Sequence, residues 1–348
     1  MRRSSWALAG LALAAALLAG CGRAPAGPQP IVLRYASPYP PNHPFSQADI
    51  AWMRRVEAES GGQLKITPFW GGALVSSDYA TLELAHGVAD IALVTPIYSR
   101  GGMRAIKTQT GFYEGAQTPD QQVAVYRCLE KTFPVLDQEM AGVHVLAIQG
   151  GSLPNVITRS RPLRTLDDFR GLRLRTPSEL APLLRQLGAD PVTMPMADVY
   201  SALSKGVIDG VVAPPDTLRS LHFAEVADTI SLFAVPRGAY PARAISARSW
   251  ARLPPKLQAV LAANEPYWED QLDRRVAAAA ADGLAFGRAH GERVVQPTEA
   301  EQGRFLVRYD ATDLAEAKRE ATPDFDGPAM LAAAHQAIAR LHAGQPAC

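Results

Sequence analysis

The chain has 348 residues, and its 35 Lys and Arg residues nearly balance its 34 Asp and Glu residues. This balance excludes the concentrated positive charge on which nucleic-acid binding depends. The length exceeds what one hydrophobic core usually organises, so it predicts two lobes.

The first residues are typical of an export signal. Arg2 and Arg3 precede an apolar run from Trp6 to Leu18 that is rich in Ala and Leu. A secretory signal peptide has this pattern. The run is shorter than the roughly 20 apolar residues that span a bilayer, so a transmembrane anchor is the weaker interpretation.

The apolar run ends in Leu-Ala-Gly before Cys21, and this quartet resembles the lipobox of bacterial lipoproteins. We therefore predict a lipoprotein signal peptide over residues 1–20 and a lipid on Cys21 that anchors a periplasmic or extracytoplasmic protein to a membrane. Residues 21–30 are mostly Gly, Ala and Pro, and they are expected to form a flexible tether. The alternative is an unmodified cysteine after an ordinary cleaved signal.

Two further cysteines, Cys128 and Cys348, have no metal-binding spacing. They can pair in an oxidising compartment. The alternative is a single buried Cys128 and a frayed Cys348.

Apolar periodicity and turn residues predict strands that alternate with helices from residue 31 onward. The expected order is a strand over 31–36, a helix over 46–59, a strand over 64–70 and a helix over 78–86. Such a βαβα order predicts a parallel sheet that is covered on both faces.

Further along, strands are expected over 143–149, 172–177 and 191–195, and helices over 178–187, 198–205 and 328–342. A long helical stretch over 255–290 is interrupted near Pro266 and Gly283. A helix of that length can lie across both lobes.

Two segments of the chain resemble each other in sequence, and we call this resemblance the internal echo. Residues 84–94 and 203–213 both contain Gly-Val-x-Asp between a predicted helix and a predicted strand. The Gly suits a left-handed helix cap, and the Asp can bond nearby backbone amides. The echo favours two lobes of like construction, and the alternative is a common turn that arose twice.

The sequence lacks a recognisable catalytic or cofactor site. The closest match to a serine-hydrolase elbow, residues 150–154, has Pro where the last Gly is required. The seven His residues are scattered, and neither phosphate-binding glycine motif occurs. We therefore expect no enzyme activity, no metal and no cofactor.

One arginine is placed where a binding site would use it. Arg173 and Arg175 share one face of a predicted strand, and Arg175 lies at its end, just before a helix begins. Ligands of α/β sheets bind at that edge, and a guanidinium can hold a carboxylate through two parallel hydrogen bonds. The alternative is an arginine paired to a neighbouring acid or simply solvated.

Several motifs around this arginine occur in a fixed order, over residues 162–177, 187–189, 194–203 and 206–210. Together they closely resemble the solute-binding components of tripartite ATP-independent periplasmic (TRAP) transporters. The resemblance implies an α/β, two-lobed periplasmic binding protein fold with a ligand cleft between the lobes and a long domain-spanning helix. It also implies that Arg175 pairs with the ligand carboxylate, and that Ser178 and Met196 line the pocket.

The resemblance also gives the expected division of the chain. Lobe I would comprise residues 31–154 plus about 242–285, and lobe II residues 155–241 plus about 286–345. The lobes would close on a small organic acid, which a separately encoded membrane permease then receives.

Two departures from the family pattern shape the expected ligand. Many relatives carry a second arginine after the strand that ends here at Gln149, whereas this chain reads Ser-Leu-Pro-Asn up to Asn155. We therefore expect the second cation to be missing. The usual Glu-Asn pair is replaced by a segment that ends at Asp216. We therefore expect a monocarboxylate rather than a dicarboxylate or a sialic-acid-like sugar.

The expected site around Arg175 surrounds an apolar or aromatic ligand body. Its members are Ser178, Met196, Asn155, Trp70, Tyr98, Pro214, Asp216 and Tyr240. For Met196 and the aromatic residues, ordinary core packing is the alternative. Other functions left open are ligand presentation to a sensor kinase, an enzyme on a similar scaffold, and an envelope interaction lipoprotein with a degenerate cleft.

Overall fold

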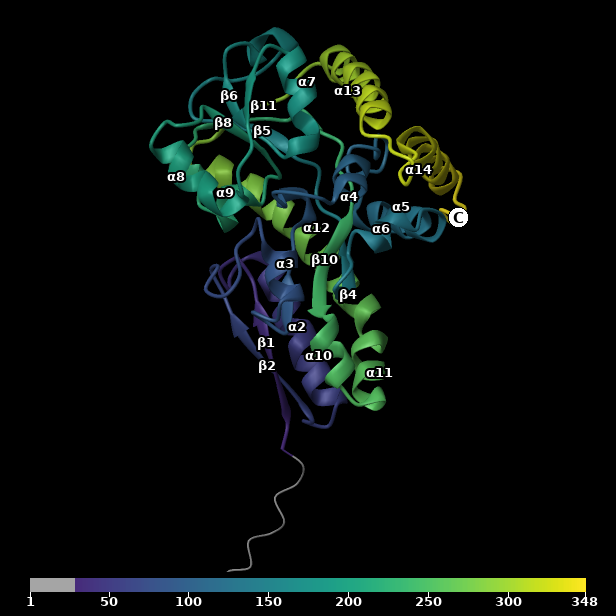
Figure 1. Cartoon of the computed structure of the whole chain (residues 1–348). Helices are drawn as coiled ribbons and strands as arrows, with labels where there is room; N and C mark the ends of the chain where they lie inside the picture. The colour runs from purple at the N-terminus through teal and green to yellow at the C-terminus, as the bar shows by residue number, and fades with distance from the viewer. Residues whose placement is uncertain (1–28) are drawn as a thin grey trace, which may run out of the picture.

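The computed structural model describes residues 29–348, which form two lobes, each built on its own β-sheet (Figure 1). The predicted signal peptide, Cys21 and nearly all of the predicted tether lie outside the described residues. Within 29–348, no helix combines the length and the apolar character needed to cross a membrane.

The sheet of the first lobe has five strands in the order β2-β1-β3-β10-β4. They are β1 (Ile31–Ala36), β2 (Leu64–Phe69), β3 (Ile91–Leu93), β4 (Val143–Gln149) and β10 (Tyr240–Ser246). The helices of this lobe include α2 (Pro44–Glu59), α3 (Ala80–Ala85), α4 (Arg104–Gln109), α5 (Pro119–Thr132), α6 (Val135–Gln138), α10 (Ala247–Arg252) and α11 (Pro255–Ala263).

The sheet of the second lobe has six strands in the order β11-β9-β5-β8-β6-β7. They are β5 (Asn155–Thr158), β6 (Arg173–Arg175), β7 (Asp190–Val192), β8 (Gly210–Ala213), β9 (Thr229–Ser231) and β11 (Arg293–Val295). Short helices α7 (Ala181–Gln186), α8 (Val199–Ser204) and α9 (Thr217–Ser220) cover it.

The expectation of wholly parallel sheets is wrong at the strands that join the lobes. The chain leaves the first sheet through β4 and enters the second through β5, then returns from β9 to β10. Because β10 enters the first sheet from the cleft side, it runs antiparallel to both β3 and β4. In the second sheet, β5 is likewise antiparallel to β8 and β9.

The internal echo has the same geometry in both lobes. Gly87 and Gly206 have φ angles of 83° and 68°. Asp90 accepts hydrogen bonds from the backbone N–H and the guanidinium Nε of Arg34, at 2.9 and 3.1 Å. Asp209 accepts the same two bonds from Arg173, at 2.8 and 3.2 Å. Each pair joins the end of a helix-to-strand turn to the neighbouring strand, so both halves of the echo are structural clamps.

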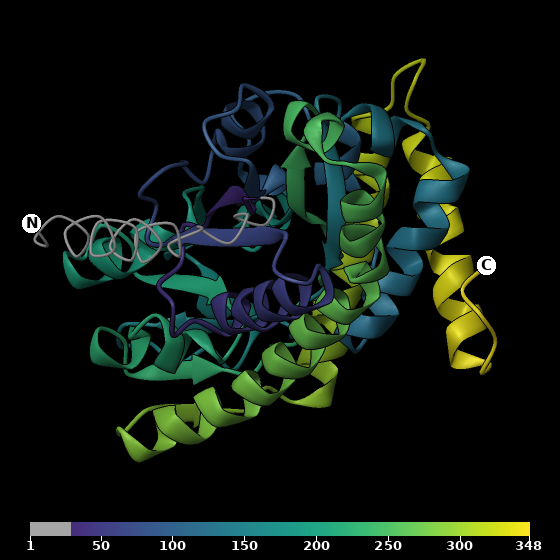
Figure 2. The same cartoon turned by 90° about the horizontal axis from the view of Figure 1, so that it is seen from below.

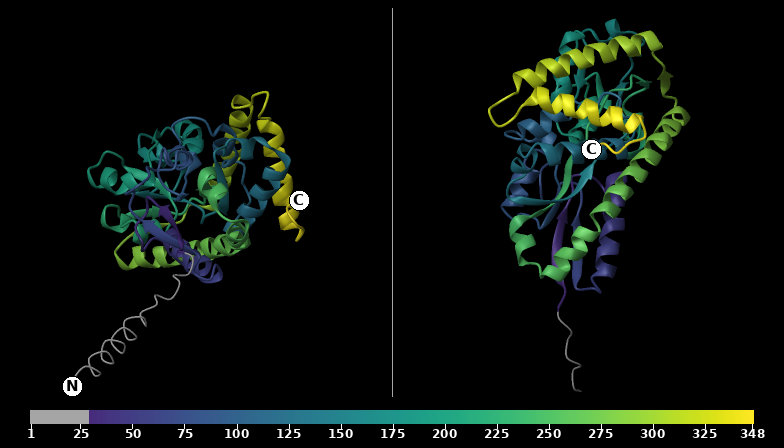
Figure 3. Two further views of the ribbon diagram at one scale, coloured as in Figure 1. Left: turned by 60° about the horizontal axis from the view of Figure 1, so that its bottom comes forward. Right: turned by 90° about the vertical axis from the view of Figure 1, so that its right-hand side faces the viewer.

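A long helix, α12 (Glu265–Ala289), runs beside both lobes (Figures 2 and 3). Its 25 residues span about 37 Å at 1.5 Å per residue. In the first lobe, Trp268 stacks on Trp52 of α2 with 3.6 Å between ring centroids. In the second lobe, α12 packs against α9. The helix therefore connects the two cores mechanically.

The predicted interruption of this helix at Gly283 is wrong, whereas the break before Pro266 is present at Asn264. Gly283 lies inside α12, where an added Cβ would be 2.2 Å from the carbonyl oxygen of Pro215. The glycine is therefore required by close packing between helix and loop rather than by a bend.

The C-terminal region contains two helices, α13 (Glu299–Arg319) and α14 (Gly327–His342). Helix α13, which periodicity did not predict, places Phe305 and Tyr309 in the core of the second lobe. The division expected from sequence assigned residues 286–345 to lobe II. Helix α14 nevertheless packs on α5 and α4 of the first lobe. The right panel of Figure 3 shows α13 and α14 side by side.

A buried polar network fixes the first sheet to its helices. Arg243 of β10 donates from Nε to Asp49 Oδ1 at 2.8 Å, and Trp268 Nε1 donates to the same oxygen at 2.9 Å. Tyr35 of β1 donates to the other oxygen at 2.5 Å. These side chains are buried, so the arrangement holds β1, β10, α2 and α12 in one register.

Candidate functional site

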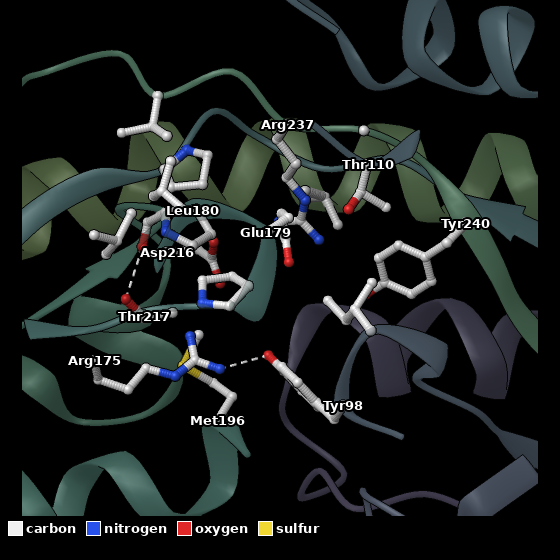
Figure 4. Close-up of a pocket in the computed structure, with 18 of the residues that line it drawn as sticks. Tyr98, Thr110, Arg175, Glu179, Leu180, Met196, Asp216, Thr217, Arg237 and Tyr240 are labelled. Carbon is white, nitrogen blue, oxygen red and sulfur yellow. Dashed lines mark hydrogen bonds between the residues drawn. The ribbon is translucent and has the colours of Figure 1, made fainter. Parts of the chain in front are cut away.

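A cavity lies between the two lobes, and residues from both sheets form its wall (Figure 4). The first lobe contributes Tyr39, His43, Phe45, Ile97, Tyr98, Thr110 and Tyr240. The second lobe contributes Arg175, Pro177, Glu179, Leu180, Met196, Val212, Pro214, Asp216 and Thr217, while α12 and α13 add Val276 and Tyr309. The wall is thus mainly aromatic and aliphatic, with a few charged groups.

Arg175, the last residue of β6, is fully buried at this wall. Its Nε and Nη2 donate to the carbonyl oxygen of Met194 at 3.0 and 2.9 Å, and Nη2 also donates to Tyr98 Oη at 2.8 Å. The last bond crosses from the second lobe to the first. Nη1 is buried without a hydrogen-bond partner among the described residues.

The surroundings of Arg175 differ from those of an ordinary structural arginine. Arg173, two residues earlier on the same strand, is held by Asp209. Arg175 has no ion pair with any Asp or Glu in residues 29–348. A buried guanidinium without a counter-charge is energetically costly. Binding of an anion at Arg175 would remove this cost.

A second guanidinium, that of Arg237, also lines the cavity, which the sequence interpretation missed. It comes from the connection between β9 and β10. A Cβ added to Gly151 would lie 2.4 Å from Arg237 Cζ, so the arginine packs directly over that glycine. Gly151 is fixed by Gln122, which accepts from its N–H at 2.8 Å and donates to its carbonyl oxygen at 3.0 Å.

The expectation that a second cation is missing is therefore wrong for the cavity, although it holds for the segment after β4. The side chain reaches the cavity from a different part of the chain, because β9 and β10 return past the same edge. In the sequence, the one available signal was an arginine between Pro236 and Gly238 just before a strand.

Two carboxyl groups in the wall have raised pKa values because burial disfavours their charged forms. Burial raises the pKa of Glu179 to about 7, against the lowering influence of Arg175 and Arg237. Its Oε2 is buried without a hydrogen-bond partner among the described residues. Burial likewise raises the pKa of Asp216 to about 6, against the hydrogen bond from Ser220 and the charge of Arg237.

His43 takes part in the aromatic wall as a neutral ring. It stacks on Tyr39 with 4.2 Å between ring centroids, and its Nδ1 accepts from the N–H of Phe45 at 3.2 Å. Burial lowers the pKa of His43 to about 3, and the charge of Arg243 adds to that effect.

The structure brings six of the nine sequence-predicted binding residues to the cavity. They are Arg175, Met196, Tyr98, Pro214, Asp216 and Tyr240.

Three predicted residues lie elsewhere. Ser178 is exposed and faces surface hollows, whereas Leu180 of the same 3-10 turn, Ser178–Leu180, is buried and lines the cavity. Asn155 is buried in β5 and donates to the carbonyl oxygen of Phe233 at 3.0 Å. Trp70 packs edge-on against Tyr35 in the core of the first lobe.

Two α/β lobes around a shared cavity, with a buried arginine and aromatic rings in its wall, define the class of two-lobed binding proteins. The model of bacterial extracellular solute-binding protein family 7 matches residues 35–309. The chain belongs to this family, the solute-binding components of TRAP transporters, which are transport proteins and not enzymes.

Curated relatives align over parts of the chain. The sialic acid-binding periplasmic protein SiaP of Vibrio cholerae is 35% identical over 77 residues, which are 22% of this chain and 24% of SiaP. The C4-dicarboxylate-binding periplasmic protein DctP of Rhodobacter capsulatus is 26% identical over 212 residues, or 58% of this chain and 61% of DctP. These alignments therefore span less than two thirds of either relative.

Solved structures match over nearly the whole fold. A TRAP solute-binding protein from Rhodoferax ferrireducens in complex with copurified benzoate has a TM-score of 0.82 at 25% identity, covering 90% of this chain and 99% of that one. A TRAP periplasmic solute-binding protein from Bordetella bronchiseptica with bound mandelate has a TM-score of 0.80 at 22% identity, covering 90% and 100%. At 22% identity, the similarity to the mandelate-bound protein shows a shared fold alone.

Proposed function

We propose that this protein captures a small monocarboxylate with an apolar or aromatic body outside the cytoplasm and delivers it to a TRAP-type permease. In this proposal Cys21 carries a lipid that keeps the protein at the membrane where the permease lies. Tethering would raise the effective concentration of loaded protein at that surface.

The observation that carries the proposal is the unpartnered Nη1 of the buried Arg175 at the cavity wall. The other two guanidinium nitrogens are held by Met194 and Tyr98, so the plane of the group is fixed before a ligand arrives. A carboxylate at Nη1 would supply the missing counter-charge at little cost in ordering the side chain.

The rest of the wall supports an apolar ligand body. The rings of Tyr39, Phe45, Tyr98 and Tyr240 and the side chain of Met196 face this space. Aromatic faces and edges favour a ring or branched aliphatic body over a hydrated sugar. The benzoate and mandelate bound by two structurally similar proteins are acids of this kind.

The test is identification of a co-purified ligand by native mass spectrometry, followed by titration of the stripped protein with benzoate, phenylacetate, mandelate and succinate. Arg175→Gln should weaken binding of the preferred acid roughly 10- to 100-fold, because a hydrogen-bonded charged partner contributes about 1.5–3 kcal/mol. Isothermal titration calorimetry measures the change in Kd.

The matched control is Arg173→Gln. Arg173 lies two residues before Arg175, pairs with Asp209 and does not line the cavity. The Kd of this variant should stay within about twofold of wild type, because a substitution that does not contact the ligand changes its binding little. Equal affinities for wild type and Arg175→Gln would refute the anchoring role. Failure of every acid to bind would favour an interaction protein with a degenerate cleft.

A further inference from the structure

The position of Arg237 gives the cavity a second point of polar recognition. Its guanidinium enters from the connection that precedes β10, over Gly151, and it forms no ion pair with an Asp or Glu of the described residues. Figure 4 shows it pointing into the same space as Glu179, while Arg175 lies on another side of the cavity beside Tyr98.

Glu179 faces that space with an unsatisfied acceptor. Its Oε2 is buried and has no hydrogen-bond partner within residues 29–348. A buried acceptor without a donor is costly, and each such atom is expected to find a partner in the functional state. Arg237 and Glu179 therefore offer a donor and an acceptor side by side.

The charges of the wall limit what can fill this space. Two guanidinium groups share the wall with two carboxyl groups, Asp216 and Glu179. Burial raises the pKa values of both carboxyls, which weakens their negative charge against the two guanidinium groups. The wall therefore favours a ligand that carries one carboxylate.

We propose that the ligand is a hydroxy monocarboxylate, with its carboxylate on Arg175 and its hydroxyl between Arg237 and Glu179. A hydroxyl accepts one hydrogen bond and donates another, so it satisfies the Arg237 guanidinium and Glu179 Oε2 together. A bare hydrocarbon ring would leave both unpaired. This inference rests on the proposed function and names the substrate class of the same site.

The experiment compares pairs of acids that differ by one hydroxyl: benzoate with 3-hydroxybenzoate, and phenylacetate with mandelate and with 3-hydroxyphenylacetate. For wild type, at least one hydroxylated acid should bind about tenfold more tightly than its parent, since sites that pair a hydroxyl discriminate against its absence. Calorimetry gives each ratio of Kd values.

Arg237→Gln should weaken binding of the hydroxylated acid more than binding of the parent acid, so that the ratio falls to about twofold or less. Arg175→Gln should weaken parent and hydroxylated acid alike. Arg237→Lys, which keeps a donor, should retain part of the preference. Unfolding temperatures without ligand show that each variant is folded, and Arg173→Gln is the matched control.

The possible results distinguish the hydroxy-acid inference from the proposed function. Binding of parent acids without a hydroxyl preference, or a preference that Arg237→Gln leaves unchanged, overturns the hydroxy-acid inference and leaves the proposed function standing. Failure of all pairs to bind overturns both.

Discussion

Glu179 is placed where a change in its ionisation affects both stability and the ligand. Its carboxyl group lies at the cavity wall and also borders a charged hollow on the outer side of the turn that carries it. The ionisable groups that influence it or respond to it are Arg175, Arg237, Lys107, Tyr309 and Asp313. Burial outweighs the two arginines and raises the pKa of Glu179 from 4.5 to about 7.

This shift predicts a pH dependence of stability. A carboxyl group with a raised pKa binds its proton more tightly in the folded state. Its contribution is therefore complete below the unfolded value of 4.5 and is lost as pH rises through about 7. Urea unfolding of wild type and Glu179→Gln at several pH values should show a difference in unfolding free energy that changes through this window.

Because Gln cannot ionise, the variant should lose less stability than wild type as pH rises through this window. The losses caused by the raised pKa values of Asp216, Glu265, Asp273 and Glu292 are the same in both proteins. Parallel pH profiles for the two proteins would contradict the assignment. Ionised Glu179 would also repel an anionic ligand in the same cavity, so the affinity for an anion should fall over the same rise in pH.

At the level of elements, the contact between α12 and the loop after β8 links the long helix to the cavity. Gly283 of α12 lies directly against the backbone of Pro215, and the neighbouring residues Pro214 and Asp216 line the cavity. Displacement of the helix at this point would therefore displace part of the binding wall.

Gly283→Ala should destabilise the protein by about 1–3 kcal/mol, because overpacking against a backbone carbonyl forces the helix outward. It should also weaken ligand binding. Gly303→Ala in α13 is the control, since nothing lies within 4 Å of an added Cβ there, and replacing an exposed helical glycine should stabilise by about 0.5–1 kcal/mol. Equal changes in urea midpoint for both variants would contradict the packing argument.

At the scale of the whole molecule, the lobes are joined by the two strand connections, by α12 and by the hydrogen bond between Arg175 and Tyr98. That hydrogen bond joins the two lobes at the wall of the cavity, so the proposed ligand anchor is itself part of the contact between lobes. A ligand that contacts both sides should favour the closed arrangement over an open one.

Small-angle scattering should therefore show a smaller radius of gyration when the preferred acid is added to wild type or to Arg173→Gln. Arg175→Gln should show no such decrease at the same ligand concentration. A wild-type radius unchanged at saturating ligand would contradict ligand-driven closure.

The features that sequence predicted well are those fixed by neighbouring residues. The two Gly-Val-x-Asp turns form the expected contacts because the Asp and its partner strand follow from local geometry. Arg175 lies at the cavity wall, as its position at the end of a strand before a helical turn predicted. Strands over 31–36 and 143–149 have the predicted bounds.

The features that sequence missed depend on where distant segments meet. Arg237 reaches the cavity only because the chain returns between lobes beside Gly151, and no local pattern reports that approach. The antiparallel direction of β10 has the same origin. Ser178 lies outside the cavity because, in the 3-10 turn over Ser178–Leu180, it is Leu180 that is buried at the cavity wall while Ser178 is exposed.

The last two helices, α13 and α14, also join the two lobes. Helix α13 packs in the core of the second lobe, and α14 packs on the first. Tyr309 Oη of α13 also donates to the carbonyl oxygen of Gly111 in the first lobe, at 2.8 Å. Any rotation that opens the cavity must break this bond or bend the segment between the helices. The C-terminal helices are therefore a further connection between the lobes, and they would resist a rotation that opens the cavity.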